Sequence, residues 1–290
     1  MAPKVFLITG CSTGFGNEYV KTALQDGHKV VATARKPSTL TFDGANDSNL
    51  LGIPLDVTDS KSIDSAFAAA VKKFGSVDVV VNNAGYGLTG EFEALSDAQI
   101  RQQMEVNFFG LIAVTRKAME TMRDLKTGGV IQQITSIGGQ IGMPLRSIYH
   151  ASKWAVEGFT ESVSQEVKPE WGIKFTCIEP GGFRTDWAGR SMEFAETKNP
   201  AYDHLHGHSV MSRQEGYQAG DPVKGVQAFY ELAMMENPPL HCVVGTDAYA
   251  LMKAKLERYA ESVEKHKELS NSTDVDGYKS QGLPRLAWNV

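Results

Sequence analysis

Short apolar runs alternate with longer amphipathic segments along most of this chain, and this alternation limits the folds open to it. A short apolar run is typical of a buried strand, and an amphipathic segment between two runs is typical of a helix that connects parallel strands. Repetition of this unit predicts a doubly wound α/β fold, with a seven-stranded parallel sheet and helices on both faces. The predicted strands are Val5–Thr9, Lys29–Thr33, Leu51–Leu55, Val77–Val81, Val130–Thr135, Ile173–Ile178 and Leu240–Gly245.

Residues with strong capping preferences delimit the helices between these strands. The segments Gly14–Gln25 and Ser60–Phe74 are each followed within two residues by a glycine, which is favoured just past a helix end. Asp221 and Pro222 are typical of the N-cap and first turn of a helix, and this one is expected to run to about Met235. A further helical stretch is predicted over Ser96–Arg123.

The 290 residues are expected to form one domain over residues 1–269, because no repeat or Pro/Ser-rich linker divides them. Residues 182–220 are polar and without clear period, and they are expected to form a lid over a site. Residues 270–290 form a polar tail, in which Leu283–Trp288 could dock on a partner subunit.

Composition excludes several classes of function. The net charge is −5 with no long block of like charge, which argues against a nucleic-acid or anionic-membrane surface. Three dispersed cysteines suggest neither a disulfide framework nor a zinc site. No apolar run approaches the ~18 residues of a membrane span, and the N-terminal run is too short for a signal peptide. A soluble, cytoplasmic protein is therefore expected.

A glycine-rich segment, Thr9-Gly10-Cys11-Ser12-Thr13-Gly14-Phe15-Gly16, lies between the first strand and the first helix. Glycines allow the backbone to turn tightly and approach a pyrophosphate, whose charge then meets the N–H groups and the positive dipole at the helix start. Because the loop stands in the first strand–helix unit, it predicts nucleotide binding rather than a plain turn.

The second strand ends at Ala34, where NAD-binding folds usually place an acidic residue on the ribose 2′-hydroxyl. Without that residue a 2′-phosphate is not repelled, and Arg35, followed by Lys36, can bind it through charge-assisted hydrogen bonds. The alternative is that both cations only decorate a loop. Asp56 could accept a hydrogen bond from adenine while Val57 packs on the ring, although Asp56 could instead only start a turn. NADP(H) is thus preferred over NAD(H).

Tyr149 and Lys153 stand four residues apart, so on a helix they share one face. A free tyrosine has a pKa of about 10, and a nearby ammonium or a positively charged nicotinamide favours the phenolate. This spacing alone is common on solvated helices. The motifs around Tyr149 and Lys153 in the sequence favour a functional role for the pair.

Several motifs stand in one order along residues 4–245: the Thr9–Gly16 loop, Asn82-Asn83-Ala84-Gly85, Asn107, Ser136, the segment from Tyr149 to Lys153, and Pro180-Gly181. In this order they resemble the short-chain dehydrogenase/reductase family. The chain looks most similar to its NADP-preferring reductases, which resemble retinol and 17β-hydroxysteroid dehydrogenases. The resemblance implies a Rossmann-type domain and hydride transfer between nicotinamide C4 and a carbonyl or alcohol carbon.

The resemblance also implies roles for individual residues. Tyr149 would be the general acid in reduction and the base in oxidation, Ser136 would hold the substrate oxygen, and Lys153 would lower the tyrosine pKa and bind the nicotinamide ribose. Asn107 would hold a water linking Lys153 to solvent. Cofactor contacts are expected from Gly10, Ser12, Thr13, Gly14, Phe15, Gly16, Arg35, Lys36, Asp56, Val57, Asn83, Ala84, Gly85, Tyr149, Lys153, Pro180, Gly181, Phe183 and Thr185.

An apolar set of residues is predicted to form the substrate pocket, which indicates a hydrophobic ketone, aldehyde or secondary alcohol. Alternatives are an enzyme without net redox change, such as an epimerase, dehydratase or cyclase, and a catalytically silent NADP(H)-binding regulator. Family likeness suggests a homodimer or homotetramer. The predicted pocket residues are Tyr86, Leu88, Met143, Pro144 and Trp187, with Phe183.

Three tempting features are set aside. His150 adjoins Tyr149, but adjacent helical residues point about 100° apart and cannot share a target. The histidines of Asp203–His208 suggest a metal, which the proposed chemistry does not need, so no metal is expected. Cys11 could be oxidisable at a helix N-terminus, but a packed cysteine is the simpler interpretation.

Overall fold

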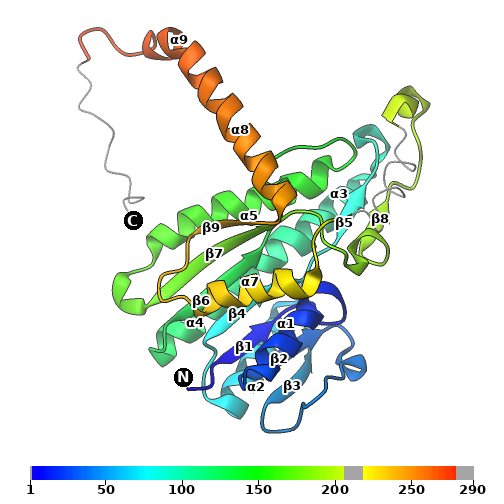
Figure 1. Cartoon of the computed structure of the whole chain (residues 1–290), viewed down its shortest axis with the longest axis vertical. Helices are drawn as coiled ribbons and strands as arrows, with labels where there is room; N and C mark the ends of the chain where they lie inside the picture. Colours follow the sequence, from blue (N-terminus) through cyan, green and yellow to red (C-terminus); the bar gives the residue numbers. More distant parts are fainter. Residues whose placement is uncertain (1, 206–217, 279–290) are drawn as a thin grey trace.

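The computed structural model describes residues 2–205 and 218–278. Its main sheet has seven parallel strands in the order β3-β2-β1-β4-β6-β7-β9 (Figure 1). All seven predicted strands are confirmed, with ends within two residues of those expected. They are β1 (Val5–Ile8), β2 (Lys29–Ala34), β3 (Leu50–Pro54), β4 (Val79–Asn82), β6 (Gly129–Ile134), β7 (Ile173–Pro180) and β9 (His241–Val244).

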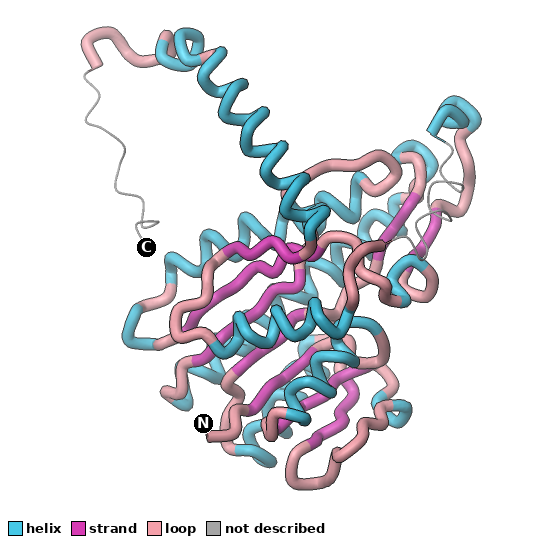
Figure 2. The backbone as a smooth tube through the Cα atoms, in the orientation of Figure 1, coloured by secondary structure: helices cyan, strands magenta, loops and turns pink. Residues whose placement is uncertain are grey.

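Helices cover both faces of this sheet, as predicted (Figure 2). Alternate residues of a strand point to opposite faces. Phe6 and Ile8 of β1 therefore pack in the core beneath α1 (Gly14–Gln25) and α7 (Pro222–Met234). Leu7 packs in the core beneath α2 (Ser60–Phe74), α4 (Leu111–Leu125) and α5 (Ser147–Glu166).

The strand order reverses between β1 and β4, which the chain places side by side. In open α/β sheets, ligands bind in the crevice outside the carboxyl ends of the strands at such a switch point. The glycine loop follows β1 and the Asn83–Gly85 segment follows β4, so both predicted motifs stand at this crevice.

The predicted helical stretch over residues 96–123 is confirmed, but it is not one regular helix. It consists of α3 (Asp97–Met104), a π-helical segment η3 (Glu105–Gly110) and α4. A Ser96–Gln99 capping box begins α3. Asn107 lies within the π-helical turn, a feature that occurs frequently at functional sites.

The structure adds elements that the sequence did not predict. A second, two-stranded sheet joins β5 (Gly87–Thr89) to β8 (Met192–Phe194), so part of the predicted lid, residues 182–220, is fixed to the body. Near the C-terminus, α8 (Thr246–Lys265) and α9 (Lys267–Asn271) extend away from the sheet (Figure 1). Short turns are η1 (Pro37–Thr39), η2 (Phe92–Ala94), η4 (Ile137–Gly139), η5 (Pro169–Trp171), η6 (Asp186–Ala188) and η7 (Pro200–Leu205).

Within residues 2–205 and 218–278, no helix is both long and apolar enough to cross a membrane. Residues 206–217 of the predicted lid and the predicted docking segment Leu283–Trp288 lie outside the described residues.

Candidate active site

A cavity of about 930 Å³ runs along the carboxyl ends of the sheet strands, from Arg35 at one end to Trp187 at the other. This volume is near the upper end of the range of about 300–1,000 Å³ typical of ligand sites. The lining joins the predicted nucleotide motifs to the predicted reacting residues. One continuous site therefore brings together segments that are far apart in the sequence.

The glycine loop forms one wall of this cavity, and its conformation requires residues without a Cβ atom. Gly10 and Gly14 have φ angles of 73° and 59°, a left-handed conformation that glycine adopts without strain. A Cβ at Gly10 would lie 2.9 Å from the Cα of Ala84. A Cβ at Gly16 would lie 2.4 Å from the carbonyl oxygen of Gly10, so Gly16 supports the loop from behind and is not in the lining.

Two polar side chains fix this loop to the segment after β4. The Asn83 Nδ2 atom donates to the carbonyl oxygens of Thr9 and Gly10, at 2.9 and 3.1 Å. The Thr9 hydroxyl accepts from the backbone N–H groups of Asn83 and Ala84, both at 3.0 Å. Because Thr13 provides no side-chain cap, the first N–H groups of α1 remain available to an anion. The cradle fits a pyrophosphate.

At the far end, the exposed Arg35 and the side chains of Asp56 and Val57 line the cavity, whereas Lys36 does not. The Asp56 Oδ1 atom accepts hydrogen bonds from the backbone N–H and hydroxyl of Thr58, at 3.0 and 2.7 Å, and these bonds lower the pKa of Asp56. The turn-forming role that the sequence left open is thus present. Asp56 still lies where an adenine contact is expected.

The reacting end combines α5 with the turn after β6. Tyr149 and Lys153 lie on one face of α5, and the Tyr149 hydroxyl forms a hydrogen bond with Ser136, the N-cap of η4. The Lys153 Nζ atom donates to the carbonyl oxygen of Ile134 at 2.8 Å and lies 5.9 Å from the centroid of the Tyr149 ring. Of the four predicted catalytic residues, Ser136, Tyr149 and Lys153 line the same cavity, and Asn107 does not.

Burial decides the protonation of these groups. It raises the pKa of Tyr149, and the hydrogen bond from Ser136 and the charge of Arg146 oppose that rise. Burial also lowers the pKa of Lys153 to about 8, against the opposing charge of Glu157. Desolvation thus outweighs both opposing effects, whereas the lowering of the tyrosine pKa expected from Lys153 together with a positively charged nicotinamide stays a prediction. At neutral pH, Tyr149 holds its proton.

Asn107 is buried near Lys153. Its Oδ1 atom accepts from the Tyr86 N–H at 3.1 Å, and its Nδ2 atom donates to the Tyr86 carbonyl at 2.9 Å and to the Ser152 hydroxyl at 3.2 Å. A Cβ at Gly85 would lie 3.1 Å from Asn107 Oδ1 and 3.9 Å from Lys153 Nζ, so both groups flank this glycine. The role of Asn107 in holding a water stays a prediction.

The structure places some of the predicted pocket residues in the cavity lining and others outside it. Tyr86, Met143 and Trp187 line the cavity, together with Pro180, Gly181, Phe183 and Thr185. Leu88 does not, because it lies in β5 and points into the core with 1% of its surface exposed. Pro144 is exposed to solvent outside the lining. These two pocket predictions are not supported by the structure.

Four charged residues in the lining were not predicted from the sequence: Asp247, Arg146, Arg190 and Glu193. Asp247, near the start of α8, accepts from the Gly182 N–H at 2.7 Å and so seats the loop after β7. Arg146 places its guanidinium 5.2 Å from the centroid of the Trp187 ring, and Glu193 of β8 also lines the cavity. Each comes from a segment remote from its partners, so no local motif marks it.

His150 and Cys11, which the sequence analysis discounted as reactive groups, have structural roles. The discounted histidine segment Asp203–His208 lies partly outside the described residues. His150 accepts from the Met143 N–H at 3.0 Å through Nδ1, and burial lowers its pKa to about 4, which keeps it neutral. Cys11 is fully buried, which raises its pKa to about 12 and leaves little reactive thiolate. Of the histidine segment, His206 and His208 lie outside the described residues.

Comparisons with known proteins agree with this geometry. The model of the short chain dehydrogenase family matches residues 4–195. An uncharacterized oxidoreductase from Schizosaccharomyces pombe, C162.03, is 38% identical over 285 residues, which make up 98% of this chain and 96% of that protein. Retinol dehydrogenase 8 from Bos taurus is 34% identical over 204 residues, 68% of this chain and 64% of that protein.

Solved structures give the same answer. The crystal structure of a short-chain dehydrogenase from Streptomyces avermitilis has a TM-score of 0.84 and 34% identity, and the match covers 94% of this chain and 100% of that one. Other solved structures that match are described with NADP or with NAD bound. The sequence and the fold thus agree: this chain belongs to the short-chain dehydrogenase/reductase family of oxidoreductases.

Proposed function

We propose that this protein is an NADP(H)-dependent reductase of hydrophobic ketones or aldehydes, which also oxidises the matching alcohols. The observation that carries the proposal is the convergence of Ser136, Tyr149 and Lys153 on a cavity that is continuous with the glycine cradle. A cradle without the three side chains would fit a binding protein. Three side chains without the cradle would have no source of hydride.

The cofactor preference is argued from the adenosine end. The β2 strand ends at Ala34, which offers no carboxylate to a ribose 2′-hydroxyl, and the exposed Arg35 follows it in the cavity wall. A guanidinium can form paired hydrogen bonds with a phosphate. These two features support NADP(H) over NAD(H).

Each side chain at the reacting end has a defined task. When bound, the dinucleotide supplies or accepts the hydride at nicotinamide C4. Ser136 donates a hydrogen bond to the substrate oxygen, and Tyr149 transfers its proton to that oxygen as negative charge develops there. Lys153 holds positive charge next to the phenolate that results. The raised pKa of Tyr149 suits reduction, because the residue starts protonated at neutral pH.

The substrate class follows from the wall beyond these groups. Tyr86, Met143, Phe183 and Trp187 give it an apolar character, and the Trp187 ring centroid lies 5.2 Å from that of Tyr149. A flat or extended apolar group attached to the carbonyl carbon would be covered by this wall. Arg146, over the same indole ring, adds one cation at its edge.

A homo-oligomer is part of this proposal. Phe109 of η3 and Trp154 of α5 leave 49% and 47% of their surfaces exposed. Large apolar side chains exposed on helices are commonly covered by a protein partner. Light scattering should give a dimer or tetramer, and a strict monomer would contradict this part of the proposal.

The test is an assay of NADPH oxidation with a panel of apolar ketones and aldehydes. The measured quantity is the loss of NADPH absorbance. Turnover by the wild-type protein, abolished in Tyr149→Phe, is the expected result. Tight NADPH binding with no turnover on any member would favour a regulator. A product formed without NADPH consumption would favour an epimerase, dehydratase or cyclase.

A further inference from the structure

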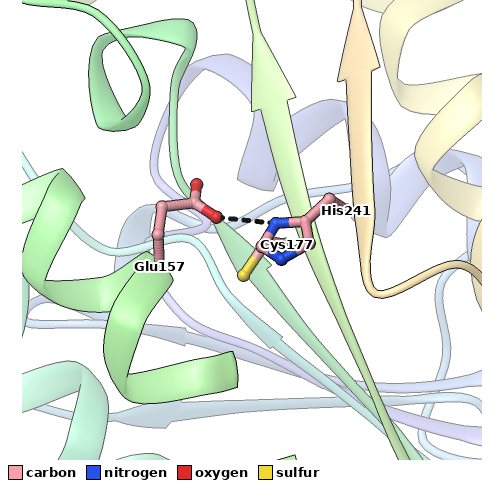
Figure 3. A group of neighbouring side chains, drawn as sticks. All are labelled: Glu157, Cys177 and His241. Atoms are coloured by element: carbon pink, nitrogen blue, oxygen red, sulfur yellow. Dashed lines mark hydrogen bonds and ion pairs between the residues drawn. The ribbon is translucent and has the colours of Figure 1, made fainter. Parts of the chain in front are cut away.

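A partly buried cluster of charged side chains lies between α5, β7 and β9, with His241 and Glu161 about one third exposed. We call it the His241 cluster, and it consists of His241, Glu157, Glu161, Glu179 and Cys177. Figure 3 shows that Glu157 and Cys177 point toward the imidazole ring from the helix and from the neighbouring strand. Glu157 and Glu179 expose only 5% and 1% of their surfaces. No step of the proposed reaction uses this cluster directly.

Carboxylates surround both nitrogens of the His241 ring. The Nδ1 atom lies 3.1 Å from Glu157 Oε2 and 3.1 Å from Glu179 Oε1, and the Nε2 atom lies 3.1 Å from Glu161 Oε1. A carboxylate can only accept, so both ring nitrogens donate, and a ring that donates twice is an imidazolium. These hydrogen bonds raise the pKa of His241 to about 10.

The same side chains could be considered for a metal, because single ligand atoms of Glu157, Cys177 and His241 lie within 4.8 Å of one another. A metal would have to displace the proton that faces Glu157 and Glu179, and it would need Cys177 as thiolate. Burial raises the pKa of Cys177 well above its usual value, which opposes thiolate formation. The arrangement therefore favours a bound proton over a metal ion.

The cluster contacts both elements that carry catalytic side chains. Glu157 stands one turn beyond Lys153 on α5, and its charge favours the ammonium form of that lysine. A Cβ at Gly139 would lie 3.0 Å from Glu157 Oε1, so this carboxylate packs directly on η4. The Gly139 N–H in turn donates to the Ser136 carbonyl at 2.7 Å.

A second link reaches the same turn. The Gln140 Nε2 atom donates to Glu179 Oε1 at 3.2 Å, and the Gln140 Oε1 atom accepts from Lys255 of α8 at 3.4 Å. Lys255 also interacts electrostatically with Glu157 and Glu179. The carboxylates that face His241 thus come from α5 and β7, and α8 adds a cation that acts on two of them.

We propose that His241 is a positioning residue: as an imidazolium it fixes the carboxylates of Glu157 and Glu179, and through them it holds Lys153 charged and the Ser136 turn in place. Its importance for turnover rests on the proposed function, whereas its effect on the protonation of Lys153 does not. A permanent cation at this position should therefore replace it, and a neutral amide should not.

The proposal has a pH signature with a defined sign. A histidine whose pKa is higher in the folded than in the unfolded protein contributes its full stabilisation below its unfolded pKa of about 6.5, and loses it as the pH rises. For His241 that loss extends to about pH 10. Thermal stability should therefore fall from neutral pH toward pH 10 more steeply in the wild-type protein than in His241→Arg.

The decisive experiment is a pH titration of the lysine side chains by carbon-13 NMR, with the Lys153 signal identified by its loss in Lys153→Ala. We expect the Lys153 midpoint to fall by about one pH unit in Glu157→Gln, which removes the counter-charge of Lys153. We expect the same fall in His241→Gln, because the carboxylates of Glu157 and Glu179 lose the cation between them and repel each other away from Lys153. One pH unit is tenfold in the protonation equilibrium. His241→Arg should restore the wild-type midpoint. The same His→Gln change at the exposed His266, which follows the last residue of α8, is the matched control and should leave the Lys153 midpoint unchanged.

Turnover provides the second reading. The alkaline limb of kcat/KM should move to lower pH in His241→Gln and Glu157→Gln, with about a fivefold loss at pH 8, because a one-unit fall from about 8 lowers the ammonium fraction of Lys153 from about one half to about one tenth. His241→Arg should recover most of that loss. If no carbonyl is turned over by the wild-type protein, the proposed function fails, and the NMR titration still decides the role of His241.

Several results would overturn the proposal. An unchanged Lys153 midpoint in both amide variants would remove the link to catalysis, and equal impairment of His241→Arg and His241→Gln would show that charge is not what matters. A change in the Lys153 midpoint on chelation or on addition of Zn²⁺ alone would assign the cluster to a metal instead.

Discussion

The two ends of the cavity differ in the atoms that line them: backbone at one end and side chains at the other. The nucleotide end is made largely of backbone. Gly10 and Gly14 have positive φ angles. Gly16 packs so closely on the loop that a Cβ at this position would lie 2.4 Å from the Gly10 carbonyl oxygen. The reacting end is made of side chains, with Tyr149 and Lys153 on α5 and Ser136 on the turn after β6.

This difference predicts which changes each end tolerates. A backbone cradle is damaged by adding a single Cβ, because the ligand or a neighbouring carbonyl occupies that space. A side-chain site is damaged by removing one functional group while the shape persists. Cofactor affinity and chemistry should therefore be separable by substitution.

The largest effect is expected at the reacting end. Tyr149→Phe removes the proton donor but keeps the ring that packs 5.2 Å from Trp187. We expect kcat to fall about 10³-fold, within the range for losing a general acid, with NADPH affinity within about twofold of wild type. Steady-state kinetics and fluorescence titration measure the two quantities. Full activity, or an equal loss of both, would refute the separation.

The complementary change adds a methyl group at the nucleotide end. Gly16→Ala puts a Cβ 2.4 Å from the Gly10 carbonyl and 2.5 Å from Asn83 Nδ2. We expect NADPH to bind about 100-fold more weakly, since displacing the loop costs about 2–3 kcal/mol.

Gly27→Ala is the matched control for this change. Gly27 also has a positive φ, 79°, but nothing lies within 4 Å of its would-be Cβ. It should lower thermal stability without changing NADPH affinity. Equal affinity losses in the two variants would show that general destabilisation, not the cradle, is responsible.

The adenosine end supplies a smaller effect. Arg35→Gln should weaken NADPH binding about tenfold, because it removes a charge-assisted contact to the 2′-phosphate, and NADH binding should not change. Arg258→Gln, on the exposed part of α8, is the control. Tighter binding of NADH than NADPH by the wild-type protein would contradict the cofactor preference.

The smallest effect is expected at the substrate wall. Trp187→Ala removes an apolar face beside Tyr149 and should raise KM for bulky apolar carbonyls about fivefold, with NADPH affinity unchanged. A small carbonyl substrate is the internal control, because it cannot reach this wall. An equal increase for both substrates would show that Trp187 supports the site generally.

The sequence predicted what depends on local residue patterns. The seven strands follow from apolar runs, and the cradle follows from glycines between β1 and α1, where spacing alone determines the chemistry. Tyr149 and Lys153 lie one helical turn apart, and the motifs in order around them, from the Thr9–Gly16 loop to Pro180-Gly181, marked them as site residues. These features need no knowledge of long-range packing.

The remaining features depend on segments that meet only in the folded chain. The sheet of β5 and β8 has strands of three residues each, too short to show a period, and it joins residues about 100 positions apart. That pairing turns Leu88 into the core. Asp247 reaches the Gly182 N–H from α8, 65 residues along the chain. The raised pKa of Tyr149 likewise reflects its burial by segments distant in the sequence, which no local motif encodes.

The most direct test of the central claim follows one hydrogen atom. The protein is given NADPH that carries deuterium at the transferred position of C4, together with the best carbonyl of the panel, and the product mass is measured. The account predicts an alcohol that contains one deuterium on the former carbonyl carbon, formed by the wild-type protein and not by Tyr149→Phe. A product without deuterium would contradict hydride transfer and would require a reaction without net redox change.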